Sequence, residues 1–215
     1  MSGFLRIAHR GAPRRALENT LESFLLAKAA GAQAFELDVW LTSDGVPVVF
    51  HDKTLSRLAG RGERLSSLSF SELSAVSLKG GHSIPRLQEV VEALSHPLAR
   101  VYVELKDPNP KVVSSSVAVC SDLPGAWVFS SFHHVHLAGV KGKHPTQALV
   151  DRGFWGRLSA LPGEEIGICD EMASPRLMDR LCAGAKPVIV YTVNDEERES
   201  HLRSQGAAGV FTDTW

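Results

Sequence analysis

The sequence predicts an α/β protein that folds as one compact (β/α)8 barrel of the TIM type. Two observations lead to this fold class. Short apolar runs typical of strands alternate from end to end with segments of helical pattern, and eight such runs remain once the returning arm of one hairpin is set aside. The length of 215 residues suits one large core, so residues 1–215 are predicted to form a single domain.

Nine apolar runs are expected to form strands. The second and third are joined only by LTSDG, which is too short for the crossover that parallel neighbours require. They are therefore predicted to form a β-hairpin that turns at Asp44 and Gly45, an excursion after the second barrel strand. The predicted strands cover residues 4–9, 35–40, 46–51, 100–106, 126–131, 147–150, 166–169, 187–192 and 209–212.

Helices are expected between these strands. Asn19 is the predicted N-cap of the helix TLESFLLAKAA, with Glu22 three residues later and Gly31 at its end. Pro85 is predicted in the first turn of PRLQEVVEAL. The segments SPRLMDRLCAGA and DEERESHLRSQG are expected to follow the sixth and seventh barrel strands as helices, and none is expected after the last strand. Residues 53–83 are the longest weakly patterned segment.

Composition argues against several classes of protein. Hydrophobic residues at 44% and charged residues at 22% are ordinary globular values. Because 23 basic residues balance 24 acidic ones, neither nucleic acid nor an anionic membrane surface is expected as a partner. Cys120, Cys169 and Cys182 form no C-x-x-C pair and are expected to be reduced and buried, which indicates a cytoplasmic protein. No signal peptide and no integral membrane segment is expected from the sequence.

Two predicted strands carry charged residues on one face and apolar residues on the other. In FELDVW the charged face holds Glu36 and Asp38, and in VYVELK it holds Glu104 and Lys106. The apolar faces would pack under the helices, so the charged faces are expected in the upper mouth of the barrel, where barrel enzymes hold their active sites.

Two histidines and an arginine are expected at the same rim. Pairing across the hairpin turn would put His51 near Glu36, and the first strand delivers His9 and Arg10 at its carboxyl end. Three carboxylates from two strands make the hard oxygen site that Ca²⁺ or Mg²⁺ takes, and no Cys/His set has zinc spacing.

The basic residues at this rim indicate which reaction the site would catalyse. Arg10 and Lys106 would meet an anion, for which phosphate is the natural candidate. His9 and His51 would then supply a base and an acid beside a metal-bound phosphate. Together these residues indicate cleavage of a phosphodiester.

Simpler interpretations stand beside these. A structural pair of Lys106 with Glu104 is the simpler alternative to a phosphate-binding role, and the two roles are compatible. Trp40 either lines the substrate cleft or packs in the core. Residues 133–137, HHVHL, look like a metal-binding tract, but the start of a surface helix is the simpler interpretation. Asp213, just after the last strand, is expected to make a structural hydrogen bond to the rim.

The motifs that contain these residues resemble those of glycerophosphodiester phosphodiesterases. They are AHRG, ENTLESF, FELDVWLTSDGVPVVFHDKTLSR, VYVELK, YTVN and GAAGVFTD, in that order over nearly the whole chain. The resemblance implies a metal-dependent barrel enzyme that splits glycerophosphodiesters into glycerol 3-phosphate and an alcohol. By position it implies His9 and His51 as the acid/base pair, Glu36, Asp38 and Glu104 as ligands of a divalent metal ion, and Arg10 and Lys106 as phosphate-binding residues.

Some features depart from the family pattern or leave alternatives open. Tyr191 stands where the family usually has Trp, and the segment between His51 and IPRLQEVVEAL is shorter than in many members. His9 is favoured as the base and His51 as the acid, although the roles are interchangeable on sequence grounds. The nucleophile is either water or the glycerol 2-hydroxyl. A lysophospholipase D-type activity and a catalytically inactive metal- and phosphate-binding module are the alternative functions, and the oligomeric state is left open.

Overall fold

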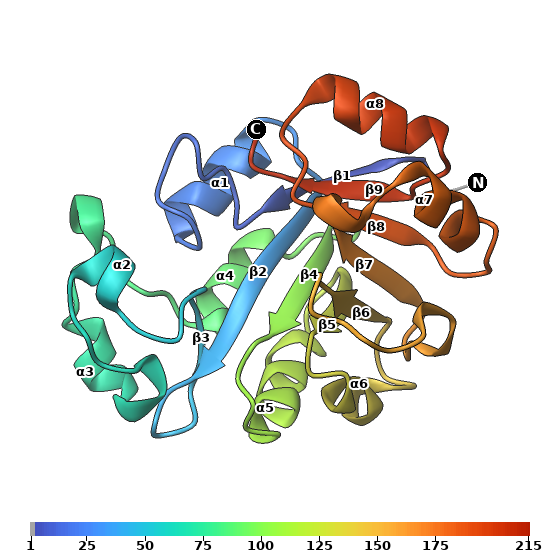
Figure 1. The fold of residues 1–215 in the computed structure, drawn as a ribbon. Helices are drawn as coiled ribbons and strands as arrows, with labels where there is room; N and C mark the ends of the chain where they lie inside the picture. The colour runs from blue at the N-terminus through green and yellow to red at the C-terminus, as the bar shows by residue number, and fades with distance from the viewer. Residues whose placement is uncertain (1–2) are drawn as a thin grey trace.

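The strands of this computed structural model, which describes residues 3–215, form a closed barrel (Figure 1). Eight parallel strands follow one another in the order β1-β9-β8-β7-β6-β5-β4-β2, and pairing of β1 with β2 closes the ring. This confirms the predicted (β/α)8 barrel. The strands are β1 Leu5–His9, β2 Ala34–Leu41, β3 Pro47–Val49, β4 Arg100–Leu105, β5 Ala126–Ser131, β6 Thr146–Val150, β7 Glu165–Cys169, β8 Val188–Tyr191 and β9 Gly209–Thr212.

The ninth strand, β3, pairs antiparallel with β2 outside the ring, as the predicted hairpin requires. Gly45 adopts φ 82° at the turn, a left-handed conformation that glycine enters without steric cost. The prediction that this strand runs to residue 51 is wrong, because β3 ends at Val49. The amide of Phe50 still donates to the carbonyl of Asp38 at 3.0 Å, so His51 begins the loop that follows the hairpin.

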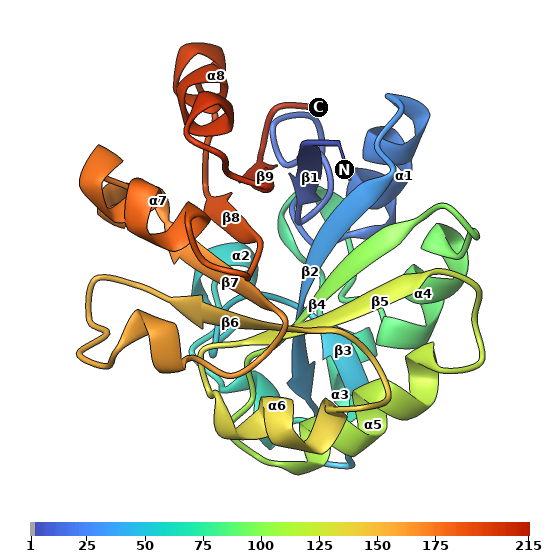
Figure 2. The same ribbon diagram turned by 90° about the vertical axis from the view of Figure 1, so that its right-hand side faces the viewer.

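Helices surround the barrel (Figure 2). The weakly patterned residues 53–83 fold into two short helices, α2 and α3, with two 3-10 turns. No helix follows β9 among the described residues. The helices are α1 Leu21–Ala29, α2 Ser56–Ala59, α3 Phe70–Ser74, α4 Leu87–Leu94, α5 Lys111–Cys120, α6 Val135–Val140, α7 Pro175–Cys182 and α8 Glu196–Ser204.

Two predicted helix starts are wrong. The N-cap of α1 is Thr20, whose side chain accepts from the amide of Ser23 at 3.2 Å, and not Asn19. Thr20 has the extended backbone that an N-cap needs, whereas Asn19 lies before the helix with φ 58°. Helix α4 starts at Leu87 after the cap residue Arg86, so Pro85 precedes the first turn instead of lying in it.

Mainly apolar side chains fill the inside of the barrel, with the buried Gln147 and Glu165 among them. One cluster brings together side chains from β1, β2, β4, β5, β6, β8 and β9, and within it Tyr102 meets Phe211 edge-on at 5.3 Å between ring centroids. Because strand residues alternate in direction, the other faces of these strands pack under the helices in two larger clusters. This filling leaves the carboxyl ends of the strands as the place for polar chemistry.

The structure bears on two expectations drawn from composition, the burial of the cysteines and the presence of membrane-spanning helices. Cys120 is buried, but Cys169 and Cys182 are only half-buried, so the prediction of three buried thiols is wrong for two of them; all three are free. Within residues 3–215, no helix combines the length and the apolar character that crossing a bilayer requires.

Candidate active site

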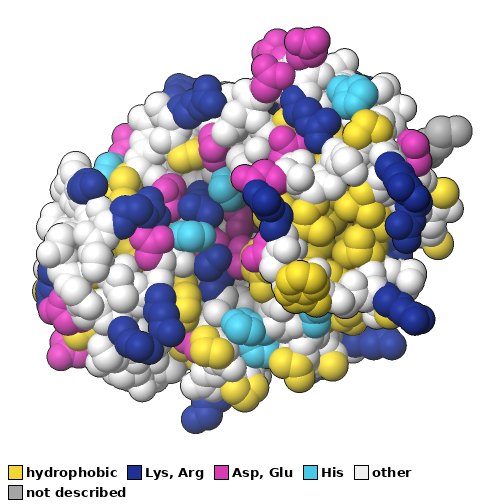
Figure 3. Space-filling model, viewed as in Figure 1, with side chains coloured by type: hydrophobic (Ala, Val, Ile, Leu, Met, Phe, Trp, Pro, Cys, Tyr) yellow, Lys and Arg dark blue, Asp and Glu magenta, His cyan; other side chains and the backbone are white. Residues whose placement is uncertain are grey.

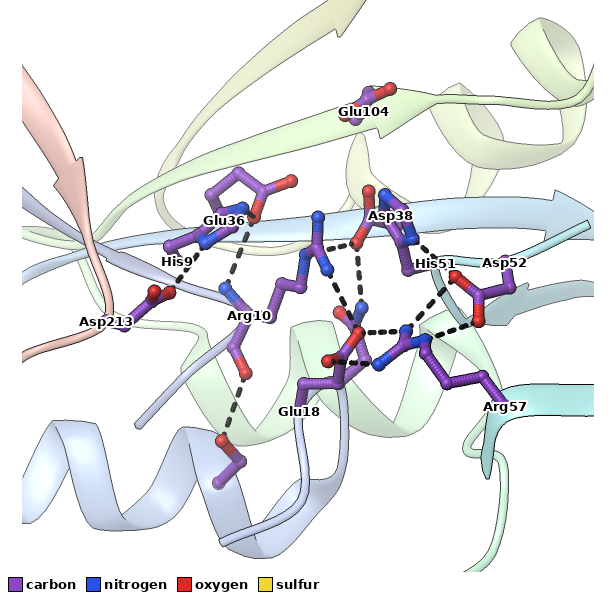
Figure 4. A network of polar contacts seen from close by, with 12 residues as sticks. His9, Arg10, Glu18, Glu36, Asp38, His51, Asp52, Arg57, Glu104 and Asp213 are labelled. Carbon is purple, nitrogen blue, oxygen red and sulfur yellow. Dashed lines mark hydrogen bonds and ion pairs between the residues drawn. The ribbon is translucent and has the colours of Figure 1, made fainter. Parts of the chain in front are cut away.

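Glu36 and Asp38 on β2 and Glu104 on β4 meet at the carboxyl ends of their strands (Figure 4). The parallel register places Asp38 beside Glu104. One oxygen of each carboxylate lies within 4.8 Å of the others, and all three side chains are buried. Within the described part of the chain this is the one such group of metal-ligand side chains, so the histidines of residues 133–137 form no second site there.

Burial and repulsion between neighbouring carboxylates disfavour the ionised forms of Glu36 and Glu104. Burial is the main cause that raises the pKa of Glu36 well above its ordinary value, and the neighbouring Asp38 adds to it. Burial likewise raises the pKa of Glu104 to about 7. Burial acts in the same direction on Asp38, but Arg10 and Lys106 outweigh it and hold the pKa of that carboxyl below its usual range.

The three carboxylates fit a divalent cation. Asp38 is fully buried, and its Oδ1 accepts no hydrogen bond in residues 3–215, although Lys106 Nζ lies 3.3 Å away. Buried carboxylate oxygens with unused acceptor capacity are the ligands that Ca²⁺ and Mg²⁺ take, and a bound cation would relieve the repulsion among them.

Arg10 and Lys106 flank the same carboxylates. Arg10 Nε lies 3.1 Å from Asp38 Oδ2, and Lys106 Nζ donates to Glu104 Oε1 at 2.9 Å. Lys106 therefore is a structural partner of Glu104, as the simpler interpretation held, and it also lines the mouth. The shared hollow measures about 130 Å³; its lining includes His9, Arg10, Glu36, His51, Glu104, Lys106, Phe132 and Tyr191.

Each of the two histidines is held by an aspartate. His9 Nδ1 lies 2.8 Å from Asp213 Oδ1, and His51 Nδ1 lies 2.7 Å from Asp52 Oδ1. Because a carboxylate accepts, each Nδ1 is assigned the proton, and Nε2 is the ring atom left for proton transfer. His9 Nε2 is 3.9 Å from Glu36 Oε2. Both rings line the hollow that Glu36 lines, in agreement with the predicted rim.

Arg57, from α2, links the two sides of the mouth. Its Nε donates to Asp52 Oδ2 at 2.6 Å, and its Nη1 donates to Glu18 Oε2 at 2.8 Å. Glu18 Oε1 in turn accepts from Arg10 Nη1 at 3.0 Å. An unbroken chain of ion pairs thus joins Arg10 to His51 (Figure 4).

Arg10 and Asn19 have strained backbones, with φ of 57° and 58°. They are the only non-glycine residues of the described range with positive φ, a conformation that costs about 1 kcal/mol or more for an L-residue. Contacts within the site hold both in place. The amide of Arg10 lies 3.2 Å from Glu36 Oε2, and Asn19 Nδ2 donates to Asp38 Oδ2 at 2.7 Å.

Two aromatic residues that the sequence singled out have distinct positions. Trp40 is buried, and its Nε1 donates to the carbonyl of His51 at 3.0 Å, so it packs and also fixes the histidine backbone. Tyr191 lines the hollow, and its hydroxyl donates to the carbonyl of Val150 at 2.7 Å. Phe132 stands edge-on to Tyr191 at 6.1 Å between ring centroids and completes this wall.

Sequence reasoning missed several members of this site. Asp52 directly follows His51, and that adjacency was its signal. Asn19 is a plausible helix cap in the sequence, which hides its contact with Asp38. The hydrogen bond to the rim expected of Asp213 is present, and its partner is His9. Arg57 lies in the weakly patterned segment, where no periodicity marks it.

This chain is similar to known glycerophosphodiester phosphodiesterases in both sequence and structure. The model of the glycerophosphoryl diester phosphodiesterase family matches residues 9–215. Glycerophosphodiester phosphodiesterase 1 of Homo sapiens is 34% identical to this chain, and the match covers 97% of this chain and 77% of the human protein. The matches to the bovine, rat and mouse proteins of that name cover less than half of the length of those proteins. A glycerophosphodiester phosphodiesterase of Caldanaerobacter subterraneus is 31% identical over 97% of this chain and 93% of its own. The structure of an Oleispira antarctica phosphodiesterase in complex with its product sn-glycerol-3-phosphate superposes with a TM-score of 0.88 and 29% identity, covering 97% of this chain and 92% of that one.

Proposed function

This chain belongs to the glycerophosphoryl diester phosphodiesterase family, and from that premise we propose that it hydrolyses glycerophosphodiesters to glycerol 3-phosphate and an alcohol with the help of a divalent cation held by Glu36, Asp38 and Glu104. One observation carries the proposal: three buried carboxylates and two histidine–aspartate pairs converge on a single hollow. The product bound to the Oleispira antarctica relative supports the same substrate class.

In this proposal the divalent cation and two basic residues together bind the phosphoryl group of the substrate. Ca²⁺ or Mg²⁺ bound by the carboxylates would neutralise charge on the phosphoryl oxygens. Arg10 and Lys106 orient those oxygens in the mouth. Lys106 has three ammonium protons and faces two carboxylate partners, Glu104 and Asp38, which leaves one proton to donate to the substrate.

The two histidines carry the proton transfers. His9, oriented by Asp213, removes the proton of the nucleophile, which is either water or the glycerol 2-hydroxyl of the substrate; the second route passes through a cyclic phosphate that is then hydrolysed. His51, oriented by Asp52, donates a proton to the departing alkoxide. Burial lowers the pKa of His51, which makes its imidazolium form the stronger proton donor.

The size of the hollow bears on the substrate. At about 130 Å³ it suits the glycerophosphate end of a diester and leaves the alcohol outside. A lysophospholipase D-type activity is the second candidate, favoured by the apolar Phe132 in the wall, which is 39% exposed. A binding module without turnover has no use for two oriented histidines.

The test begins with metal-stripped protein. Glycerophosphocholine and glycerophosphoethanolamine are supplied, Ca²⁺, Mg²⁺ or Mn²⁺ is titrated back, and release of glycerol 3-phosphate is followed. We expect product only with metal. Calorimetric Mn²⁺ titration of Glu104→Gln should show weakened binding, whereas Glu92→Gln, an exposed carboxylate on α4, should bind as wild type. Product from lysophosphatidylcholine alone would select the second candidate, and no product from any diester would reject hydrolysis.

A further inference from the structure

A groove of about 760 Å³ lies on the outside of the barrel beside α7. Between β6 and β7 the chain forms only the 3-10 helix Leu158–Ala160, so no α-helix of that connection covers the strands here. The apolar walls come from Leu158, from Ile166 of β7 and from Leu177 and Leu181 of α7. In Figure 3 a broad hydrophobic area edged by basic side chains occupies this region, on the same face as the acidic hollow of the active site.

Three cations border the groove: Arg157, Arg180 and Lys186. They come from three separate segments, which is why no basic cluster is visible in the sequence and why an anionic membrane surface was not expected from it. Within residues 3–215 none of the three is paired with a carboxylate, unlike the neighbouring Arg152 and Arg198, which pair with Glu171 and Asp170. The groove therefore presents apolar surface bordered by three cations without a carboxylate partner in the described chain, of which Lys186 donates to the carbonyl of Leu161.

The loops after β5 and β6 and the start of α6 carry further apolar side chains, here called the apolar strip: Phe132, Val135, Phe154 and Trp155. Phe132 lines the catalytic hollow, and the same loop after β5 carries His134, whose ring meets Phe154 at 5.8 Å between centroids. Trp155 follows on the loop after β6 and is 96% exposed, and Val135 is 78% exposed. Exposed apolar residues that gather in this way usually mark an interaction surface.

We propose that this face is a docking surface for an anionic phospholipid bilayer. The cations match anionic head groups, the groove can receive part of an acyl chain, and an exposed tryptophan is suited to the boundary between head groups and hydrocarbon. Docking in this way brings the active-site mouth to the level of the head groups. The proposal does not rest on the chemistry in the mouth, because vesicle binding is measured without turnover.

Charge distinguishes this occupant from a second copy of the chain. In a two-fold contact centred on the groove, the three cations of one copy would lie near the same three cations of the other. Such like charges repel across an apolar contact, whereas an anionic lipid surface attracts them.

The test is co-sedimentation with vesicles in the presence of EDTA. Vesicles of phosphatidylcholine are compared with vesicles in which a third of the lipid is phosphatidylglycerol. We expect wild type to bind the anionic vesicles about tenfold tighter or more, and Arg157→Glu/Arg180→Glu to lose about tenfold or more of that affinity. Trp155→Ser should lose binding to a similar degree and should also lose the blue shift of tryptophan emission on binding.

Matched controls separate this face from general effects. Lys79→Glu/Lys111→Glu changes the charge by the same amount elsewhere, and Leu98→Ser removes an apolar side chain that is 70% exposed outside the strip and the groove. Both controls should bind vesicles as wild type, and every variant should hydrolyse glycerophosphocholine as wild type does. Equal binding to the two vesicle types, no binding, or wild-type binding by the groove variants would overturn the proposal. A change of oligomeric state in Trp155→Ser with unchanged vesicle binding would assign the face to a second copy instead.

Discussion

Arg57 donates two hydrogen bonds to Asp52, from Nε to Oδ2 at 2.6 Å and from Nη2 to Oδ1 at 3.1 Å. Asp52 Oδ1 also lies 2.7 Å from His51 Nδ1, so the arginine acts on the orientation of the histidine through the aspartate. The same guanidinium holds Glu18, which binds Arg10. One side chain of a short outer helix thus positions both the proposed acid and a proposed phosphate ligand.

Arg57→Gln should lower kcat for glycerophosphocholine by about 10- to 100-fold, because a catalytic group displaced by about 1 Å loses rate on that scale. Arg57→Lys should recover little, since an ammonium group cannot replace the two-pronged contact. The matched control is Arg61→Gln, on the same segment, whose arginine pairs with Glu63 at the surface. If both glutamine variants behaved alike, Arg57 would be only a surface residue.

The two histidines should be separable by the leaving group. His9→Ala and His51→Ala should each lose about 100-fold or more in turnover of glycerophosphocholine, the usual value of acid–base catalysis. The p-nitrophenolate group of a p-nitrophenyl diester leaves as a stable anion and needs no proton. His51→Ala should therefore recover most of its activity on that substrate, and His9→Ala should not. His201→Ala, an exposed histidine of α8, is the control. The reverse pattern would exchange the two roles.

Metal affinity should depend on pH through Glu104, and Glu36, whose pKa burial also raises, should act in the same direction. In the protein without metal, burial raises the pKa of this carboxyl to about 7, so below that pH it carries a proton that a cation must displace. Above it the carboxylate is ionised and ready to bind. The apparent Kd for Mn²⁺ should therefore fall between about pH 6 and about pH 8, with proton release that calorimetry in two buffers counts. An apparent Kd independent of pH would remove Glu104 from the ligand set.

Features that depend on neighbouring residues could be predicted from the sequence, whereas features that depend on contacts between distant segments could not. Alternation along β2 and β4 is local, so Glu36, Asp38 and Glu104 could be assigned to one face from the sequence alone. The choice between Asn19 and Thr20 as helix cap could not be made, because both are good caps and a contact with the distant Asp38 decides it.

Contacts between distant segments left no such signal. Asp213 lies 204 positions from the His9 that it holds, and only closure of the barrel through β9 brings the two together. The cations of the lipid-docking groove likewise gather only in the folded chain. Charge counts along the sequence say nothing about such patches.

Asp213 was expected only to make a structural hydrogen bond to the rim, and its contact with His9 offers a sharp test of a larger role. Its Oδ1 lies 2.8 Å from His9 Nδ1, and its Oδ2 accepts from Asn194 Nδ2 at 2.8 Å. Asp213→Asn keeps the shape of the side chain but removes the negative charge that stabilises an imidazolium, so kcat should fall by about 100-fold or more while KM stays near wild type.

Two further measurements separate this positioning role from a structural one. The urea midpoint of Asp213→Asn should stay close to that of wild type, because the residue is only half-buried at the rim. Asp122→Asn, at an exposed turn after α5, should change neither kcat nor the midpoint. A variant with wild-type kcat would mean that Asp213 merely makes the structural hydrogen bond expected from its place after the last strand, and that His9 holds its tautomer without help.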